Sequence, residues 1–231
     1  MQSPNLQARD FSPLVFDGVL AIVGGGVVDE TFLRSLHADG THIIAADGGA
    51  EVCAQAGVMP EAIVGDMDSL KDPGSWAEKT LLIKLDEQET TDFEKCLYST
   101  RAPLTLALGM TGKRFDHTLC ALDAVARYAG DRRIILVDEQ DIALAITGAF
   151  TFEVSPGERV SIHPLREITF QVSKGLRYAL DGVTLAPGRR TGTSNAAVKG
   201  IFSIVPGAVE MSPWLLILSR HNLQRLIALF V

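Results

Sequence analysis

The feature that most constrains the fold is a regular alternation of short apolar runs with helical patterns in the first two thirds of the chain. The runs are apolar along their whole length and are bounded by Gly, Asp or Pro: residues 19–23, 43–46, 62–64, 81–83, 104–108 and 134–137. Strands of this kind are typical of a parallel sheet covered on both faces. Residues 1–146 therefore predict an α/β domain with a mostly parallel sheet flanked by helices.

Helix signals lie between these runs. Thr91 and Glu94 have the spacing of a capping box, which predicts that Asp92 is the first helical residue. The apolar residues from Phe115 to Ala126 recur at helical spacing, and Gly130 follows as a stop.

The pattern changes near residue 147. Short β-branched or alternating segments follow, separated by Pro-Gly, Lys-Gly and Asp-Gly pairs. These signals predict a smaller all-β, sandwich-like domain over residues 147–231. The last segment, residues 222–231, fits either a short helix or a frayed tail.

Composition limits the partners of the chain. A net charge of -7 argues against nucleic acid, and it suggests that a divalent cation mediates any meeting with phosphates. The three cysteines show no metal-binding spacing, and no apolar stretch approaches a membrane span. Residues 1–10 lack the pattern of a signal peptide, so we expect a cytoplasmic protein without a membrane partner.

Four motifs follow predicted strands, where ligands gather in open α/β sheets. They contain Asp47, the pair Asp66 and Asp68, the segment 88–92, and the segment 109–117. Each motif alone fits a turn or a helix cap. Together, carboxylates at neighbouring strand ends predict a hard cation, Mg²⁺ or Mn²⁺, between them.

The segment 109–117 has glycines and basic residues in front of a helix. Backbone N–H groups near Gly109, Thr111 and Gly112 can face an anion there, and Lys113 and Arg114 add positive charge. A glycine-containing turn with two solvated basic residues fits equally well. The run of three glycines at 24–26 matches neither a P-loop nor a dinucleotide fingerprint and predicts only a tight turn.

At these residues the chain resembles the thiamine pyrophosphokinases. The matching segments are ADGGA, GDMDS, QETTDF, GMTGKRFDH, KGLRYAL and GTSN, in that order along both predicted domains. The resemblance implies Mg²⁺-dependent transfer of a pyrophosphoryl group from ATP to the hydroxyl of thiamine. It also implies a homodimer in which the β domain of one subunit completes the site of the other.

The resemblance assigns roles to individual residues. Asp66, Asp68 and Asp92 would be catalytic and would hold the metal, with Asp47 beside them as the outlier. The nucleotide would be bound by Gln88, Thr91, Gly109, Thr111, Gly112, Arg114 and Asp116. Ser194 and Asn195 would face thiamine, and Trp214 would either stack on thiamine or be a core aromatic.

Three points stay open at the level of the sequence. Glu87 stands where relatives commonly have Asp. Four carboxylates carry more charge than one Mg²⁺ offsets, so either two ions bind or some of the acids do not touch metal. A metal-dependent nucleotide phosphohydrolase and a non-catalytic thiamine or nucleotide sensor are the alternative functions.

Overall fold

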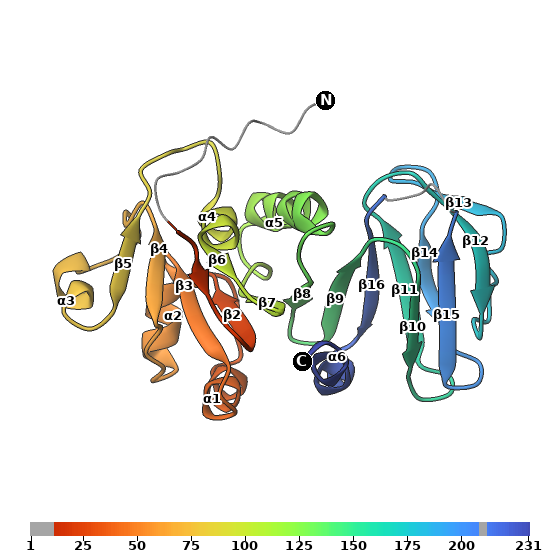
Figure 1. Cartoon of the computed structure of the whole chain (residues 1–231), viewed down its shortest axis with the longest axis horizontal. Coiled ribbons are helices and arrows are strands. Elements are labelled where there is room, and N and C mark those ends of the chain that lie inside the picture. The colour runs from red at the N-terminus through yellow and green to blue at the C-terminus, as the bar shows by residue number, and fades with distance from the viewer. Residues whose placement is uncertain (1–11, 208–211) are drawn as a thin grey trace.

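A mixed ten-stranded sheet runs through the whole molecule in the computed structural model (Figure 1). Helices cover both faces at one end, and a second sheet of four strands packs against the other end. The structure describes residues 12–207 and 212–231, so the segment 1–10, for which we expect no signal peptide, lies outside the described residues.

The predicted parallel sheet is confirmed. Its strand order is β8-β7-β2-β3-β4-β5, and all five pairings are parallel. The strands are β2 (Val19–Val23), β3 (His42–Ala46), β4 (Ala62–Gly65), β5 (Leu81–Lys84), β7 (Leu104–Leu108) and β8 (Ile134–Val137). Val23 pairs with both Ala45 and Leu108, so three strands end side by side.

Strand residues alternate between two apolar layers. Leu20 and Ile22 pack with buried residues of α4 and α5, whereas Ala21 and Val23 pack with those of α1 and α2. Because both layers are buried, the strands are apolar along their whole length. The helices are α1 (Glu30–Ala38), α2 (Gly49–Gln55), α3 (Pro73–Ala77), α4 (Asp92–Ser99) and α5 (Phe115–Tyr128).

Antiparallel strands extend the same sheet from β8. The order continues as β9 (Asp141–Ile146), β16 (Trp214–Ser219), β11 (Arg159–Pro164) and β14 (Gly192–Ala196). The second sheet contains β10 (Phe150–Glu153), β15 (Ile201–Pro206), β12 (Ile168–Lys174) and β13 (Val183–Leu185). The two sheets form the predicted sandwich. Since one sheet runs past residue 146, the division at that residue stays a prediction.

The ends of the described chain are also regular. A 3₁₀ turn (η1, Arg220–Asn222) leads into α6 (Leu223–Phe230), which buries Leu223 and Leu226. Of the two possibilities for the last segment, the helix is therefore the one observed. A small two-stranded sheet joins β1 (Leu14–Val15) to β6 (Thr100–Arg101). Among the described residues, no helix is both long and apolar enough to cross a membrane.

Candidate active site

A pocket of about 270 Å³ opens where the strand order reverses. The neighbours of β2 are β3 on one side and β7 on the other, and residues that follow each of these three strands line the pocket. Five of the predicted site residues line it: Thr91, Asp92, Gly109, Thr111 and Arg114. All three glycines of the run 24–26 line it as well.

Glycine allows the two loops at this pocket to lie against each other. The N–H of Gly26 donates to the carbonyl oxygen of Gly109 at 2.8 Å, and that of Val27 donates to Thr111 at 3.2 Å. Gly109 has a φ of 67°, and a Cβ there would lie 2.6 Å from the carbonyl oxygen of Gly24. The glycines are therefore required by close backbone approach, which leaves the loop N–H and carbonyl groups as the wall of the pocket.

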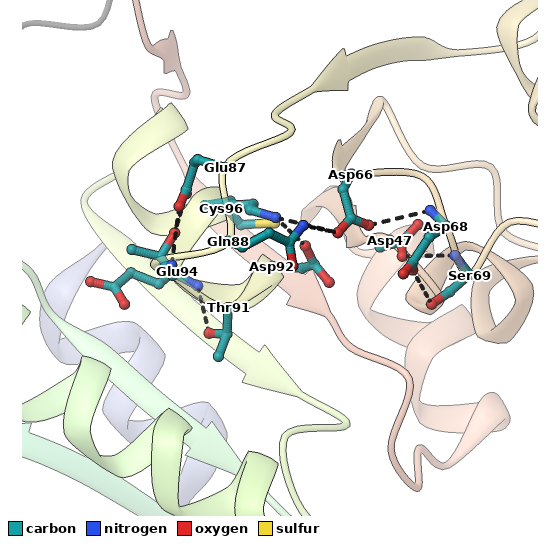
Figure 2. Close-up of polar contacts among 12 residues, drawn as sticks. Asp47, Asp66, Asp68, Ser69, Glu87, Gln88, Thr91, Asp92, Glu94 and Cys96 are labelled. Carbon is teal, nitrogen blue, oxygen red and sulfur yellow. Dashed lines mark hydrogen bonds and ion pairs between the residues drawn. The ribbon is translucent and has the colours of Figure 1, made fainter.

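The acidic motifs meet beside this pocket. Asp47, Asp66 and Asp68 each offer one oxygen, and these oxygens all lie within 4.8 Å of one another. Asp66 lies between Gln88 and Asp92 on one side and Asp47, Asp68 and Ser69 on the other (Figure 2).

Asp47 is the buried member of this cluster. Its side chain leaves a residue with a φ of 39°, a conformation that non-glycine residues seldom adopt. Oδ2 accepts from the N–H of Ser69 at 3.1 Å, while Oδ1 is buried and has no hydrogen-bond partner among the described residues. Burial, opposed by the Ser69 hydrogen bonds and helped by the charges of Asp92 and Asp66, raises the pKa of Asp47 to about 6.

Asp66 and Asp68 face the same side because of a turn at Met67. That residue has a φ of 70°, so the backbone turns between the two aspartates. Asp66 Oδ2 accepts from Nε2 of Gln88 at 2.8 Å, and Oδ1 accepts from the N–H of Asp68 at 3.2 Å. The hydrogen bond from Gln88 lowers the pKa of Asp66, so this carboxyl is ionised at neutral pH.

Asp92 is the first residue of α4, as predicted, and Oγ1 of Thr91 caps the helix by accepting from the N–H of Glu94. Its Oδ1 accepts from Nζ of Lys95 at 3.1 Å, and the same Nζ lies 3.9 Å from Oδ2 of Asp66. Burial raises the pKa of Asp92, and Lys95 opposes this rise. The ammonium of Lys95 thus lies inside the acidic site.

The donor set fits a hard divalent cation. Three carboxylates converge, and the unpartnered Oδ1 of Asp47 is a buried oxygen that a cation would satisfy. The grouping differs from the one expected, since Asp47 joins Asp66 and Asp68, whereas Asp92 is paired with Lys95. The reason is that Asp92 reaches the site from a helix and meets the lysine one turn later.

The segment 109–117 places a positive charge at the pocket, because Arg114 lines it. Arg114 donates through Nε and Nη2 to Asp116 at 3.2 and 2.7 Å, and this pairing lowers the pKa of Asp116 to about 2. Lys113 donates to the carbonyl oxygen of Gly25 at 2.7 Å. Thr111 also lines the pocket, and its Oγ1 is buried without a hydrogen-bond partner in the described structure.

Known proteins are similar in sequence to part of this chain. The family model of the thiamin pyrophosphokinase catalytic domain matches residues 33–136. Thiamine pyrophosphokinase 1 of rice (Oryza sativa subsp. japonica) is 28% identical over 155 residues, 59% of this chain and 58% of its own length. Thiamin pyrophosphokinase 1 of Caenorhabditis elegans is 27% identical over 151 residues, 59% of this chain and 62% of its own. The match thus spans about three fifths of these relatives.

Solved structures show the same fold over more of the chain. Thiamin pyrophosphokinase from Geobacillus thermodenitrificans superposes with a TM-score of 0.72 at 22% identity, covering 87% of this chain and 97% of that one. Yeast thiamin pyrophosphokinase gives a TM-score of 0.72 at 17% identity, covering 92% and 89%. Residues 33–136 are thus similar in sequence to the catalytic domain of the thiamin pyrophosphokinases, and the chain has the fold of these solved structures.

The residues that the resemblance assigns to thiamine, Ser194 and Asn195, lie on β14. Ser194 is exposed and has a φ of 59°. Asn195 is buried, and its amide is occupied by the backbone of Tyr178: Oδ1 accepts from the N–H at 3.0 Å and Nδ2 donates to the carbonyl oxygen at 2.7 Å. Asn195 therefore holds the neighbouring loop, and Ser194 is the residue whose side chain is accessible.

Trp214 requires a correction. Its side chain is fully buried, its ring packs edge-on against Phe170 at 5.6 Å, and Nε1 donates to the carbonyl oxygen of Gly148. Both faces of the ring are thus enclosed by the sandwich core, and of the two roles considered for Trp214 the core aromatic is the one observed.

Lys95 is a site residue that the sequence patterns did not predict. Its one signal was its position three residues after Asp92, which places both side chains on one face of a helix. A lysine is seldom buried, so the pattern gave no reason to place it in the core.

Proposed function

We propose that the chain is a thiamine pyrophosphokinase, which transfers the pyrophosphoryl group of ATP to the hydroxyl of thiamine and releases AMP. The observation that carries the proposal is the convergence of Asp47, Asp66 and Asp68 beside a glycine-walled pocket at the switch point of the sheet. Similarity to the thiamin pyrophosphokinases supports the substrate class.

In this proposal, Asp47, Asp66 and Asp68 hold Mg²⁺, for which Mn²⁺ can substitute. The ion would neutralise negative charge on the ATP phosphates. Gln88 donates to Asp66 and so fixes the orientation of that carboxylate.

The pocket wall binds the nucleotide. Thr111 lines the pocket, and the backbone between Gly109 and Gly112 offers N–H groups in front of α5. Arg114, held by Asp116, lies at the mouth and supplies positive charge to the phosphates. Thr91 lines the pocket beside the start of α4.

Among the four aspartates, Asp92 is the one that lines the pocket. Its raised pKa makes it a better proton acceptor than Asp66, whose pKa is lowered. We assign to Asp92 the proton that the thiamine hydroxyl loses as it attacks the β-phosphorus.

A second copy of the chain would complete the thiamine site. Six strands lie between β14 and β3, so Ser194 and the acidic cluster of one chain are on the order of 30 Å apart. Beside the pocket, Phe115 and Leu119 of α5 are 74% and 49% exposed, an apolar surface that a partner would cover. In the dimer proposed, Ser194 of one subunit faces thiamine bound over the other's aspartates.

Mixing two inactive variants tests the shared site. Asp66→Asn removes the metal ligand and Ser194→Lys places a cation against the thiazolium, so each homodimer should be inactive. Mixed dimers have one intact site and should restore about a quarter of the wild-type activity. If mixing restores none although heterodimers form, the site is not shared.

Product analysis tests the reaction itself. The purified protein is incubated with ATP and Mg²⁺, with and without thiamine, and the products are separated by chromatography. The proposal predicts thiamine diphosphate and AMP only when thiamine is present. Release of ADP or free phosphate without thiamine would identify a phosphohydrolase, and binding of both substrates without turnover would identify a sensor.

A further inference from the structure

Lys95 is the one buried lysine among residues 12–207 and 212–231, with an exposed fraction of 2%. A buried ammonium is tolerated when anions compensate its charge. Here the compensation comes from two separate elements. Asp92 precedes Lys95 by three residues on α4 and lies 3.1 Å away, and Asp66 lies 3.9 Å away at the end of β4.

The position of the ammonium matters because it separates the four carboxylates into two groups. Asp47, Asp66 and Asp68 converge on one side, while Asp92 is directed to Nζ of Lys95. Enzymes that use two divalent ions hold them about 3.5–4 Å apart. A second ion shared by Asp66 and Asp92 would need the space that Nζ occupies.

The net charge of the site supports the same role for Lys95. Four carboxylates and one divalent ion leave a net charge of about -2, which would attract a second ion. Lys95 supplies one positive charge at a fixed position. Unlike a second metal ion, its ammonium group has no open coordination positions.

We infer that Lys95 is a built-in cation that restricts the site to one divalent ion and keeps Asp92 free of metal. This inference rests on the metal site of the proposed function. Lys95 is thus a positioning residue: it acts through Asp92, whose carboxylate it holds by the 3.1 Å hydrogen bond from Nζ.

The test counts ions. Mn²⁺ alone is titrated into the full-length protein without nucleotide, and free and bound Mn²⁺ are followed by electron paramagnetic resonance. The wild type should bind one ion per chain, with the spectrum of an isolated Mn²⁺. Lys95→Met removes the charge and keeps an apolar side chain of similar length, and it should bind two ions per chain with exchange-coupled signals.

A matched control removes a lysine outside the site. Lys84 pairs with Asp86 at 3.0 Å on the surface, and Lys84→Met should still bind one ion. Asp92→Asn, which is nearly isosteric and leaves Lys95 in place, should also bind one ion. Circular dichroism and thermal unfolding show whether each variant is folded.

Several results would overturn the inference. Two ions in the wild type would do so, as would one isolated ion in folded Lys95→Met, or loss of the ion in Asp92→Asn. If Lys95→Met does not fold, the wild-type and Asp92→Asn counts still decide. No bound ion in the wild type would overturn the metal site, and with it the proposed function, which is a different outcome from a second ion.

Discussion

The carboxylate of Asp47 accepts a 3.1 Å hydrogen bond from the backbone N–H of Ser69, which ties the end of β3 to the loop after β4. Only one oxygen of Asp47 takes part in this bond, and the other is buried without a partner in the described structure. A buried carboxylate oxygen without a partner lowers the stability of the free protein, and a bound cation would offset that cost.

This arrangement predicts that Asp47→Asn stabilises the metal-free protein. The amide oxygen can still accept from Ser69, and the substitution removes a buried charge that lies near Asp66 and Asp92. We expect the free energy of unfolding in urea, measured at pH 8 with a chelator, to rise by about 1–2 kcal/mol. Metal binding should be lost. Asp17→Asn on the exposed surface is the control, and a less stable Asp47→Asn would contradict the prediction.

The packed glycine loops predict a second effect. In Gly26→Ala the new Cβ would overlap the carbonyl oxygens of Gly109 and Thr111, so the loops must part. We expect a loss of about 1–3 kcal/mol in the free energy of unfolding and a weaker affinity for ATP. Gly18→Ala, where a Cβ meets no atom within 4 Å, should change neither quantity. An unaltered ATP affinity in Gly26→Ala would remove this loop from the nucleotide site.

Glu87 gives a prediction that depends on pH. Burial alone would raise its pKa, but hydrogen bonds from Thr90, Tyr98 and the N–H of Glu89 lower it from 4.5 to about 2. Because the folded pKa is the lower one, this carboxylate stabilises the protein above pH 4.5, and the contribution is lost as the pH falls toward 2.

Glu87→Gln should therefore lower the free energy of unfolding at pH 7 by about 1–2 kcal/mol, a value reduced for partial exposure. The difference from the wild type should be the same at pH 5 and should shrink at pH 3.5. The exposed substitution Glu89→Gln is the control. A difference that grows on acidification would show that Glu87 does not hold the turn before α4 by its charge.

The enclosed ring of Trp214 predicts a structural effect without a functional one. Trp214→Phe should lower the free energy of unfolding by about 1–3 kcal/mol because it leaves a cavity and loses the bond to Gly148. The KM for thiamine should not change. A large rise in that KM with unchanged stability would return Trp214 to the thiamine site.

Much of the fold could be predicted because its signals are local. Apolar runs and their flanking turns predict β2, β7 and β8 with the bounds observed. The strand β14 was missed because its residues, GTSNA, have little strand character, and its place comes from pairing with β11 more than thirty residues earlier.

The site residues also divide into those that the sequence predicts and those that it does not. Each acidic motif could be found from its strand end, but the turn at Met67 that brings Asp66 and Asp68 to the same side could not. The burial of Lys95 could not be predicted, because its second partner, Asp66, lies 29 residues earlier on another element. The left-handed backbone at Asp47, which joins it to the cluster, likewise depends on the loop after β4.

The central claim is that this acidic cluster organises pyrophosphoryl transfer to thiamine. ³¹P nuclear magnetic resonance of one reaction mixture, with ATP, Mg²⁺ and thiamine, tests it directly for the wild type, Asp66→Asn and the surface control Asp17→Asn. The wild type and Asp17→Asn should form AMP and thiamine diphosphate in equal amounts, and folded Asp66→Asn should form neither. Formation of ADP or phosphate by the wild type, or unchanged turnover in Asp66→Asn, would contradict the claim.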